Sequence, residues 1–468
     1  MIALLLITPA VLALIALVFR KRQLNIIILV IAALVQVYAT VMLMLHPSQF
    51  TLYFRVDSLN ILFLAVLSLV FLMAAIYSID YLEHAVDDAR WTTFYTIFML
   101  LFVASMSGGL LATHLGVFWI SLEASTITSA VLVYYYRTRA ALEATWKYLF
   151  MCSIGIALSF IGIIFISAGM SGAPSLFYDD LIKNGPSASR FYLPLAFAFL
   201  VVGFGTKMGL APVHNWLPDA HSEAPAPVSA MLSATLLNTA FIGIIRIYRI
   251  AAEAGFVRFA NIVLFSMGLM SLFVSAVFVL RVKNYKRMLA YSSIEHMGIL
   301  AVALATGGAA VPAMFLQMTG HSLAKASFFL TSGTIYDRFG TKKTNEVTAL
   351  TRRAPVTGWL WLISCVAICA FPPFSLFFSE FFVLQELFAK HLVITIIVAV
   401  LLTIILYGLM SKTVSMSFGR APDDKTYRTP VVRWLPQVIL LAAALVIGIA
   451  MPAWLRNIYT AAAAWVGR

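Results

Sequence analysis

The chain is a succession of long apolar runs separated by short polar connections. Most runs are about 20 residues long, the length that an α-helix needs to cross the hydrocarbon core of a bilayer. The pattern therefore predicts an all-α integral membrane protein with about fourteen transmembrane helices. They are expected at approximately residues 2–19, 24–45, 58–79, 93–113, 114–136, 145–168, 191–211, 227–250, 260–280, 288–306, 311–335, 356–388, 392–418 and 435–455.

Two of these spans contain a signal that interrupts a helix. The apolar run 191–210 encloses Lys207, and Pro212 follows, which cannot continue a helix without losing a backbone hydrogen bond. The twelfth span contains Pro372 and Pro373. We predict that the seventh and twelfth spans are discontinuous, and broken helices in membranes usually line an ion or substrate pathway.

Composition supports the membrane assignment. The 468 residues are 62% hydrophobic and 11% charged, whereas soluble domains are about 45–50% apolar and about 25% charged. The net charge of +13 requires no nucleic-acid partner, because cytoplasmic loops of membrane proteins are rich in basic residues. Cys152, Cys365 and Cys369 form no CxxC pair, so we expect no iron–sulfur cluster, no metal site and no cofactor in this chain.

The distribution of basic residues predicts the orientation. If the N-terminus faces outward, the expected cytoplasmic loops hold 19 Lys and Arg residues and the opposite side holds 9. Basic residues favour the cytoplasmic side, so we expect a multi-pass protein of the cell (inner) membrane with both termini on the outer, periplasmic side. Because basic residues follow rather than precede the first apolar run, we interpret that run as a retained span.

Isolated charges inside apolar runs are the candidate functional residues. Burying an ionisable group in a bilayer is costly, so such groups usually mark an ion pathway. Lys207 could instead lie near a helix end and extend its ammonium to the headgroups, but the long apolar run before it favours the pathway. The proton-translocation candidates are Glu123, Lys207, Glu295, His321, Lys325 and Glu380, and the secondary polar candidates are Lys147, His214, His221, Asn238, His296 and Lys412.

The spacing of these charges predicts an internal repeat. Glu123 precedes Lys207 by 84 residues, and Glu295 precedes Glu380 by 85. Spans 4–8 and 9–13 would then be two copies of a five-helix unit, the second inverted because five is odd. Coincidence among a few charges is the alternative, and the matching proline breaks favour the repeat. The chain is accordingly divided into four parts: three N-terminal helices (residues 1–92), a first repeat (93–250), a second repeat (260–418), and a C-terminal loop with the last span (419–468).

A row of such residues could conduct protons. Opposite charges stabilise one another in a low-dielectric interior, so the protonation of one pair depends on its neighbour. His321 and Lys325 are four residues apart and share one helix face. Water held at the broken helices could connect the groups.

Several stretches resemble a known family. GTKMGLAPVHNWLPDAHSEAPAPVSA, YKRMLAYSSIEHMGIL, HSLAKASFFLTSG and PPFSLFFSEF are similar to the antiporter-like membrane subunits of respiratory complex I, Mrp-type cation/proton antiporters and membrane-bound hydrogenases. AYSSIEHMGI, LLNTAFIGIIR and LFFSEF most resemble component F of hydrogenase-4 and related formate hydrogenlyase subunits. The resemblance extends from about residue 57 to residue 418.

The resemblance implies fourteen helices with two inverted five-helix repeats around a hydrophilic axis. By motif, Glu123 corresponds to the family's fifth-helix glutamate, Lys207 to its broken-helix lysine and Glu380 to its twelfth-helix acid, and His321 falls in the histidine-bearing eleventh helix. Asn238 departs from the pattern, because complex I subunits usually carry a lysine there and an amide cannot titrate. We expect that Lys325 or a water molecule bridges this position, that the relay is shorter, or that the chain does not pump.

The leading interpretation is a proton-translocating, or Na⁺-translocating, subunit of an energy-converting oxidoreductase complex, with a membrane-bound hydrogenase or formate hydrogenlyase as the implied type. No redox site is expected in this chain, so other membrane subunits and peripheral nickel–iron hydrogenase or iron–sulfur subunits would be its partners. One alternative is a subunit of a cation/proton antiporter without a redox role. Another is a complex I-type quinone-reductase membrane subunit, with His214 or His221 at the quinone headgroup.

Overall fold

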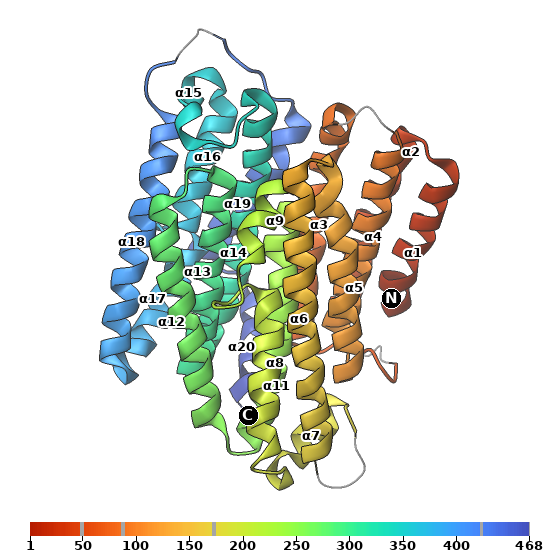
Figure 1. Ribbon diagram of the computed structural model, residues 1–468, viewed down its shortest axis with the longest axis vertical. Helices are drawn as coiled ribbons and strands as arrows, with labels where there is room; N and C mark the ends of the chain where they lie inside the picture. The colour runs from red at the N-terminus through yellow and green to blue at the C-terminus, as the bar shows by residue number, and fades with distance from the viewer. Residues whose placement is uncertain (47–50, 86–88, 171–174, 422–424, 468) are drawn as a thin grey trace.

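The computed structural model describes residues 1–46, 51–85, 89–170, 175–421 and 425–467, which form one bundle of helices (Figure 1). Within these ranges the backbone forms helices and isolated β-bridges but no strand, so the predicted all-α class is confirmed. The α-helices are α1 (Ile2–Phe19), α2 (Arg22–Leu45), α3 (Asn60–Ala85), α4 (Ala89–Leu111), α5 (Leu115–Val133), α6 (Arg139–Gly169), α7 (Tyr178–Asn184), α8 (Tyr192–Met208), α9 (Trp216–Glu223), α10 (Ala226–Met231), α11 (Leu237–Glu253), α12 (Val257–Arg281), α13 (Tyr285–Thr306), α14 (Ala310–Phe339), α15 (Leu350–Arg353), α16 (Pro355–Ile368), α17 (Ser375–Lys390), α18 (Leu392–Ser417), α19 (Val431–Ile449) and α20 (Ala453–Gly467).

Each predicted span coincides with one or more of these helices. Across the described ranges, eleven helices are long and apolar enough to cross a membrane. α14 is more polar than these eleven helices. It is buried along almost its whole length, because the helices that pack around it are α3, α10, α13, α16, α17 and α19. Its polar side chains are therefore shielded from lipid, and α14 can carry chemistry through the centre of the bundle.

The seventh span is broken as predicted. α8 ends directly before Gly209, whose φ of 78° lies in the left-handed region that glycine adopts without strain. The indole N–H of Trp216 donates to the carbonyl of Thr206 at 2.8 Å, and the amide of Ala211 donates to the hydroxyl of Ser271 at 2.9 Å. Protein groups therefore satisfy this irregular backbone, as is required at membrane depth.

The twelfth span is also broken as predicted. A connection that contains Pro372 and Pro373 separates α16 from α17. Lys207 lies in the last turn of α8, and Glu380 lies in the second turn of α17. Both breaks therefore place an ionisable candidate beside irregular backbone.

The C-terminal span differs from the prediction of one helix over 435–455. α19 ends earlier, at Ile449, and α20 follows and runs toward the lower end of the bundle, where the C-terminus is marked (Figure 1). α20 packs against α14. The hydropathy pattern missed α20 because only one of its faces is apolar, and Arg456 and Asn457 interrupt the run. Its buried residues are Leu455, Tyr459, Ala462 and Val466.

Two glycines allow α6 and α8 to pack closely. A Cβ atom at Gly203 would lie 2.5 Å from the carbonyl oxygen of Gly155, and one at Gly155 would lie 2.6 Å from the Cβ of Thr206. Small residues at such crossings let helix backbones approach each other in membranes. The close approach brings Tyr148 of α6 beside Lys207 of α8.

Candidate ion-translocation site

Lys207 is fully buried, with 0% of its surface exposed. Its ammonium donates a hydrogen bond to the hydroxyl of Tyr148 at 3.1 Å and lies 5.2 Å from the centre of the Tyr148 ring. The hydroxyls of Tyr148 and Ser129 share a hydrogen bond at 2.7 Å. The ammonium is therefore stabilised by an oxygen and a π face inside the protein, and it does not extend toward a headgroup region.

Glu123 lies on α5, the helix that also carries Ser129. Its carboxylate accepts a hydrogen bond from the hydroxyl of Thr126 at 3.2 Å. Among the described residues no ion pair joins Glu123 to Lys207, but the two groups are close enough to interact electrostatically. The hydrogen bonds from Lys207 through Tyr148 reach Ser129 on α5, the helix that carries Glu123.

Asn238 connects the first half of the chain to α14. A π-helical segment, η3 (Leu232–Leu236), lies between α10 and α11 directly before this residue, and such segments are frequent at functional sites. The Asn238 amide donates to the carbonyl of Ala234 and to the hydroxyl of Ser322, both at 2.7 Å. Asn238 is thus a hydrogen-bonding bridge where the family resemblance led us to look for a titratable group.

Three buried histidines follow along α14 and its neighbours. The ring centres of His321 and His296 are 4.8 Å apart, and the ring of His221 stacks on Phe329 at 4.8 Å. In the described part of the chain, the ring nitrogens of His221 and His321 have no hydrogen-bond partner. Buried polar groups are almost always hydrogen-bonded, so these unpartnered ring nitrogens are unusual in a protein interior.

Lys325 is the second fully buried lysine. Its ammonium donates to the carbonyl of Leu289 on α13 at 2.8 Å, one and a half turns before Glu295 on the same helix. Glu295 interacts electrostatically with Lys325, and its Oε2 atom has no hydrogen-bond partner among the described residues. The two charges are therefore coupled without a direct ion pair.

Glu380 terminates this set of contacts. The side-chain amide of Gln317 lies 3.0 Å from His296 Nδ1 and donates to Glu380 Oε1 at 3.2 Å. Ser379 donates to the amide oxygen of Gln317, which orients the NH₂ group toward the histidine and the acid. Gln317 therefore bridges His296 and Glu380, whose Nδ1 and Oε1 atoms are 3.7 Å apart.

These residues form what we call the polar row. It crosses α6, α8, α11, α14, α13 and α17, and Glu123 lies beside its first members. Its members are Tyr148, Lys207, Asn238, His321, Lys325, Glu295, His296, Gln317 and Glu380.

Three secondary candidates have no described side-chain contact with members of the polar row. Lys147 is half-exposed and forms ion pairs with Glu143 at 2.6 Å and Asp219 at 3.1 Å. Lys412 donates to the carbonyls of Val279 and Val282 at the end of α12, where a cation stabilises the helix terminus. His214 is buried in the connection after α8, and its Nδ1 atom has no partner in the described ranges.

Sequence reasoning missed Tyr148, which accepts a hydrogen bond from Lys207, and Gln317, which donates one to Glu380. It also left Lys286 in the loop between the spans expected at 260–280 and 288–306. Lys286 is buried in the first turn of α13, and its ammonium donates to the carbonyl of Ala224 at 2.6 Å. Close by, Lys342 pairs with Glu223 at 2.8 Å. These contacts join the start of α13 and the connection after α14 to the end of α9.

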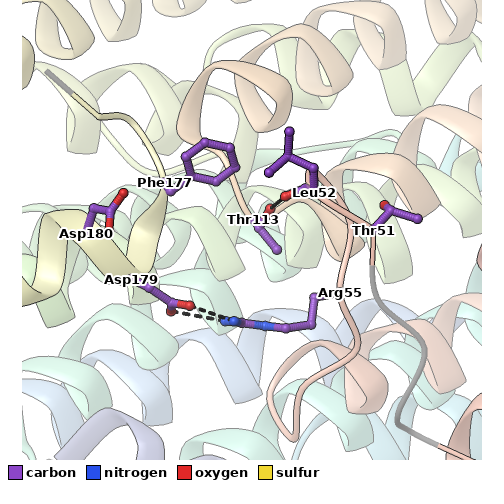
Figure 2. A pocket seen from close by; sticks show the side chains of 7 residues that line it. All are labelled: Thr51, Leu52, Arg55, Thr113, Phe177, Asp179 and Asp180. Atoms are coloured by element: carbon purple, nitrogen blue, oxygen red, sulfur yellow. Dashed lines mark hydrogen bonds and ion pairs between the residues drawn. The ribbon is translucent and has the colours of Figure 1, made fainter.

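One pocket lies away from the polar row. It has a volume of about 650 Å³ and lies in the loops at the α7 end of the bundle (Figures 1 and 2). Arg55 forms two hydrogen bonds with Asp179, at 2.6 and 3.0 Å, and they lower the pKa of the Asp179 carboxyl. The pocket is lined by Thr51, Leu52, Arg55, Thr113, Phe177, Asp179 and Asp180.

The fold and the polar row define a class: a multi-span helical membrane protein with ionisable side chains buried beside two broken helices. The chain belongs to the NADH:quinone oxidoreductase/Mrp antiporter family, whose profile matches residues 112–406. Residues 42–95 also match a profile described as the N-terminus of chain 5 of NADH-ubiquinone oxidoreductase (complex I).

Similar proteins agree with this assignment. The chain is 34% identical over 384 residues to a hydrogenase-4 component F homolog of Methylacidiphilum infernorum, covering 80% of this chain and 81% of that protein. It is 29% identical over 357 residues to hydrogenase-4 component B of Escherichia coli, covering 73% of this chain and 52% of that protein.

Solved structures share the fold. A chain of an archaeal membrane-bound sulfane sulfur reductase superimposes with a TM-score of 0.90 at 22% identity, covering 100% of this chain and 98% of that one. A chain of the Mrp complex from Dietzia sp. superimposes with a TM-score of 0.87 at 18% identity, covering 99% and 97%.

Proposed function

We propose that this chain is a proton-translocating, antiporter-like membrane subunit of an energy-converting oxidoreductase complex. The observation that carries the proposal is the buried polar row between the two broken helices, from Lys207 to Glu380. Ionisable groups are costly in a membrane and are retained where ions move. H⁺ is the proposed ion because His, Lys and Glu side chains bind and release protons, and Na⁺ is the alternative.

The row supports stepwise proton movement in which each charge influences the next. A proton leaving Lys207 removes a positive charge near Glu123, and one reaching Lys325 changes the field at Glu295. Asn238 and Ser322 provide hydrogen-bonding groups between the two lysines but hold no charge. We propose that water completes the relay there, so that an amide can occupy this position without ending transport.

Similarity to hydrogenase-4 components supports placing the chain in a membrane-bound hydrogenase or formate hydrogenlyase. Other membrane subunits would adjoin it, and peripheral nickel–iron or iron–sulfur subunits would carry out electron transfer. The proposed location is the cell inner membrane with both termini outside, as the basic-residue bias indicates. The family profile also covers Mrp antiporters, so a cation/proton antiporter subunit without a redox role is the second candidate.

The test is acidification of sealed vesicles that hold the native assembly, driven by hydrogen or formate. Lys207→Ala should abolish acidification while electron transfer continues at a reduced rate. Lys147→Ala is the matched control, because this lysine is half-exposed and lies on α6, next to Tyr148. Unchanged acidification in Lys207→Ala would overturn the proposal. Acidification that depends on an applied Na⁺ gradient but not on hydrogen or formate would favour the second candidate.

A further inference from the structure

Two acids and a histidine converge where α13 faces α17. One potential ligand atom from each of Glu295, His296 and Glu380 lies within 4.8 Å of the other two. We propose that these three side chains form a binding site for a divalent transition-metal cation of the Zn²⁺ type. The sequence analysis expected no metal site because it considered cysteine pairs, and this site joins two helices that are distant in sequence.

The geometry suits Zn²⁺. Tetrahedral Zn²⁺ with nitrogen and oxygen ligands places neighbouring ligand atoms roughly 3.3 Å apart. His296 Nδ1 and Glu380 Oε1 are 3.7 Å apart and all three ligand atoms lie within 4.8 Å of one another, so inward rotation of the side chains would bring them around one ion. The side-chain NH₂ of Gln317 faces both atoms, so Nδ1 is the unprotonated nitrogen, and a metal would take its lone pair in place of the Gln317 hydrogen bond.

An unpartnered buried atom gives independent support. Glu295 Oε2 has no hydrogen-bond partner among the described residues, and only 6% of the Glu295 surface is exposed. A buried carboxylate oxygen without a donor is costly. A bound cation would remove this cost, because two carboxylates balance its two charges.

A cavity adjoins the site. It has a volume of about 270 Å³, and Glu295, Glu380 and Cys369 line it together with mainly apolar residues of α17 and α18. The volume is sufficient for an ion with water in the open coordination positions. The nitrogen ligand of His296 favours Zn²⁺ over Na⁺, Mg²⁺ or Ca²⁺, since those ions prefer oxygen ligands.

Metal binding would hold both carboxylates in place. If these acids carry protons, Zn²⁺ would inhibit transport by occupying them; this consequence rests on the proposed function, whereas binding itself does not. The ammonium of Lys325, which could compete with a metal for these acids, donates to the backbone carbonyl of Leu289.

The experiment is calorimetric titration of the purified full-length chain, without an affinity tag, with Zn²⁺ alone. The wild type should bind one equivalent, and Glu295→Gln, His296→Gln and Glu380→Gln should each weaken affinity by at least about tenfold. Glu386→Gln is the matched control, because this acid lies on α17 but pairs with Lys390. Size-exclusion profiles confirm that each variant is folded. Absence of binding by the wild type, or equal affinity in all variants, would overturn the site.

A second variant separates this inference from the proposed function. Glu123→Gln should lose proton transport and keep wild-type Zn²⁺ affinity, because Glu123 lies in the other half of the molecule. If transport survives in Glu123→Gln and Lys207→Ala while Zn²⁺ binding is lost in the His296 variant, the proposed function fails and the metal site stands. If Zn²⁺ binding is unchanged in the His296 variant while Lys207→Ala loses transport, the site fails and the function stands.

Discussion

The ammonium of Lys207 donates to the hydroxyl of Tyr148 at 3.1 Å and lies 5.2 Å from the centre of its ring. The two residues come from adjacent helices, α8 and α6, and the contact occurs in the last turn before the first helix break. A buried ammonium is stable only where oxygen atoms or π electrons replace its hydration. Tyr148 provides both, so it sets how readily Lys207 carries a charge.

Replacing Tyr148 by phenylalanine tests this relationship. Tyr148→Phe keeps the ring and removes the oxygen that accepts from Lys207, a hydrogen bond to a charged group worth about 1.5–3 kcal/mol. We expect proton transport in vesicles to fall by at least tenfold while the amount of assembled complex stays near wild type. Tyr192→Phe is the control, because that tyrosine is partly exposed at the start of α8. Normal transport in Tyr148→Phe would show that the hydroxyl does not hold the proton-carrying form of Lys207.

The fold was largely readable from the sequence because lipid-facing helices must be almost continuously apolar. Proline and isolated charge likewise indicated both broken spans and placed Lys207 and Glu380 beside them. α20 was missed because it packs against other helices with one face only, and hydropathy averages both faces.

The partners within the site were not readable in the same way. The chain has 18 tyrosines, and nothing local marks Tyr148 as the one that meets Lys207. Lys147 and Lys207 both interrupt apolar sequence, yet Lys147 points to Asp219 at the surface and Lys207 is buried. Such differences depend on which side of a helix faces a neighbour, which is decided by tertiary packing.

The packing of α6 on α8 makes a second prediction. Gly203→Ala would place a methyl group 2.5 Å from the carbonyl oxygen of Gly155, so the helices must separate, at a cost of about 1–3 kcal/mol. The separation would also move Lys207 away from Tyr148. We expect a lower apparent unfolding temperature in detergent and slower transport. Gly467→Ala is the control, because a methyl group there meets no atom within 4 Å, and equal stability of both variants would contradict the packing argument.

A third prediction concerns pH and the loops at the α7 end. Hydrogen bonds from Arg55 lower the pKa of Asp179 in the folded protein. The ion pair therefore contributes stability above the unfolded pKa of about 3.9, and this contribution is lost as the pH falls through the lowered folded value. Because the side chains are 41% and 65% exposed, the contribution is at most about 1 kcal/mol. Asp179→Asn should lower the apparent unfolding temperature slightly at pH 7. The difference from wild type should shrink below pH 4. A difference that grows on acidification would show that the ion pair does not stabilise the protein in the way described.

The fourth prediction concerns Arg433, which connects three helices at the opposite end. Its guanidinium is 3% exposed and pairs with Asp80 on α3 and Asp337 on α14, and the rings of Tyr77 and Tyr81 lie beside it. Arg433→Met would remove the cation that Asp80 and Asp337 share, and breaking a buried pair in this way costs about 3–5 kcal/mol.

We expect Arg433→Met to lower the apparent unfolding temperature strongly in detergent, because two partly buried carboxylates repel each other once the cation is gone. Adding Asp80→Asn and Asp337→Asn should restore much of the loss, since amides need no cation. Arg428→Met is the control, because the Arg428 side chain is exposed in the connection before α19. If the triple variant were no more stable than Arg433→Met, the arginine would act mainly through packing on the two tyrosine rings, and charge compensation would not be its role.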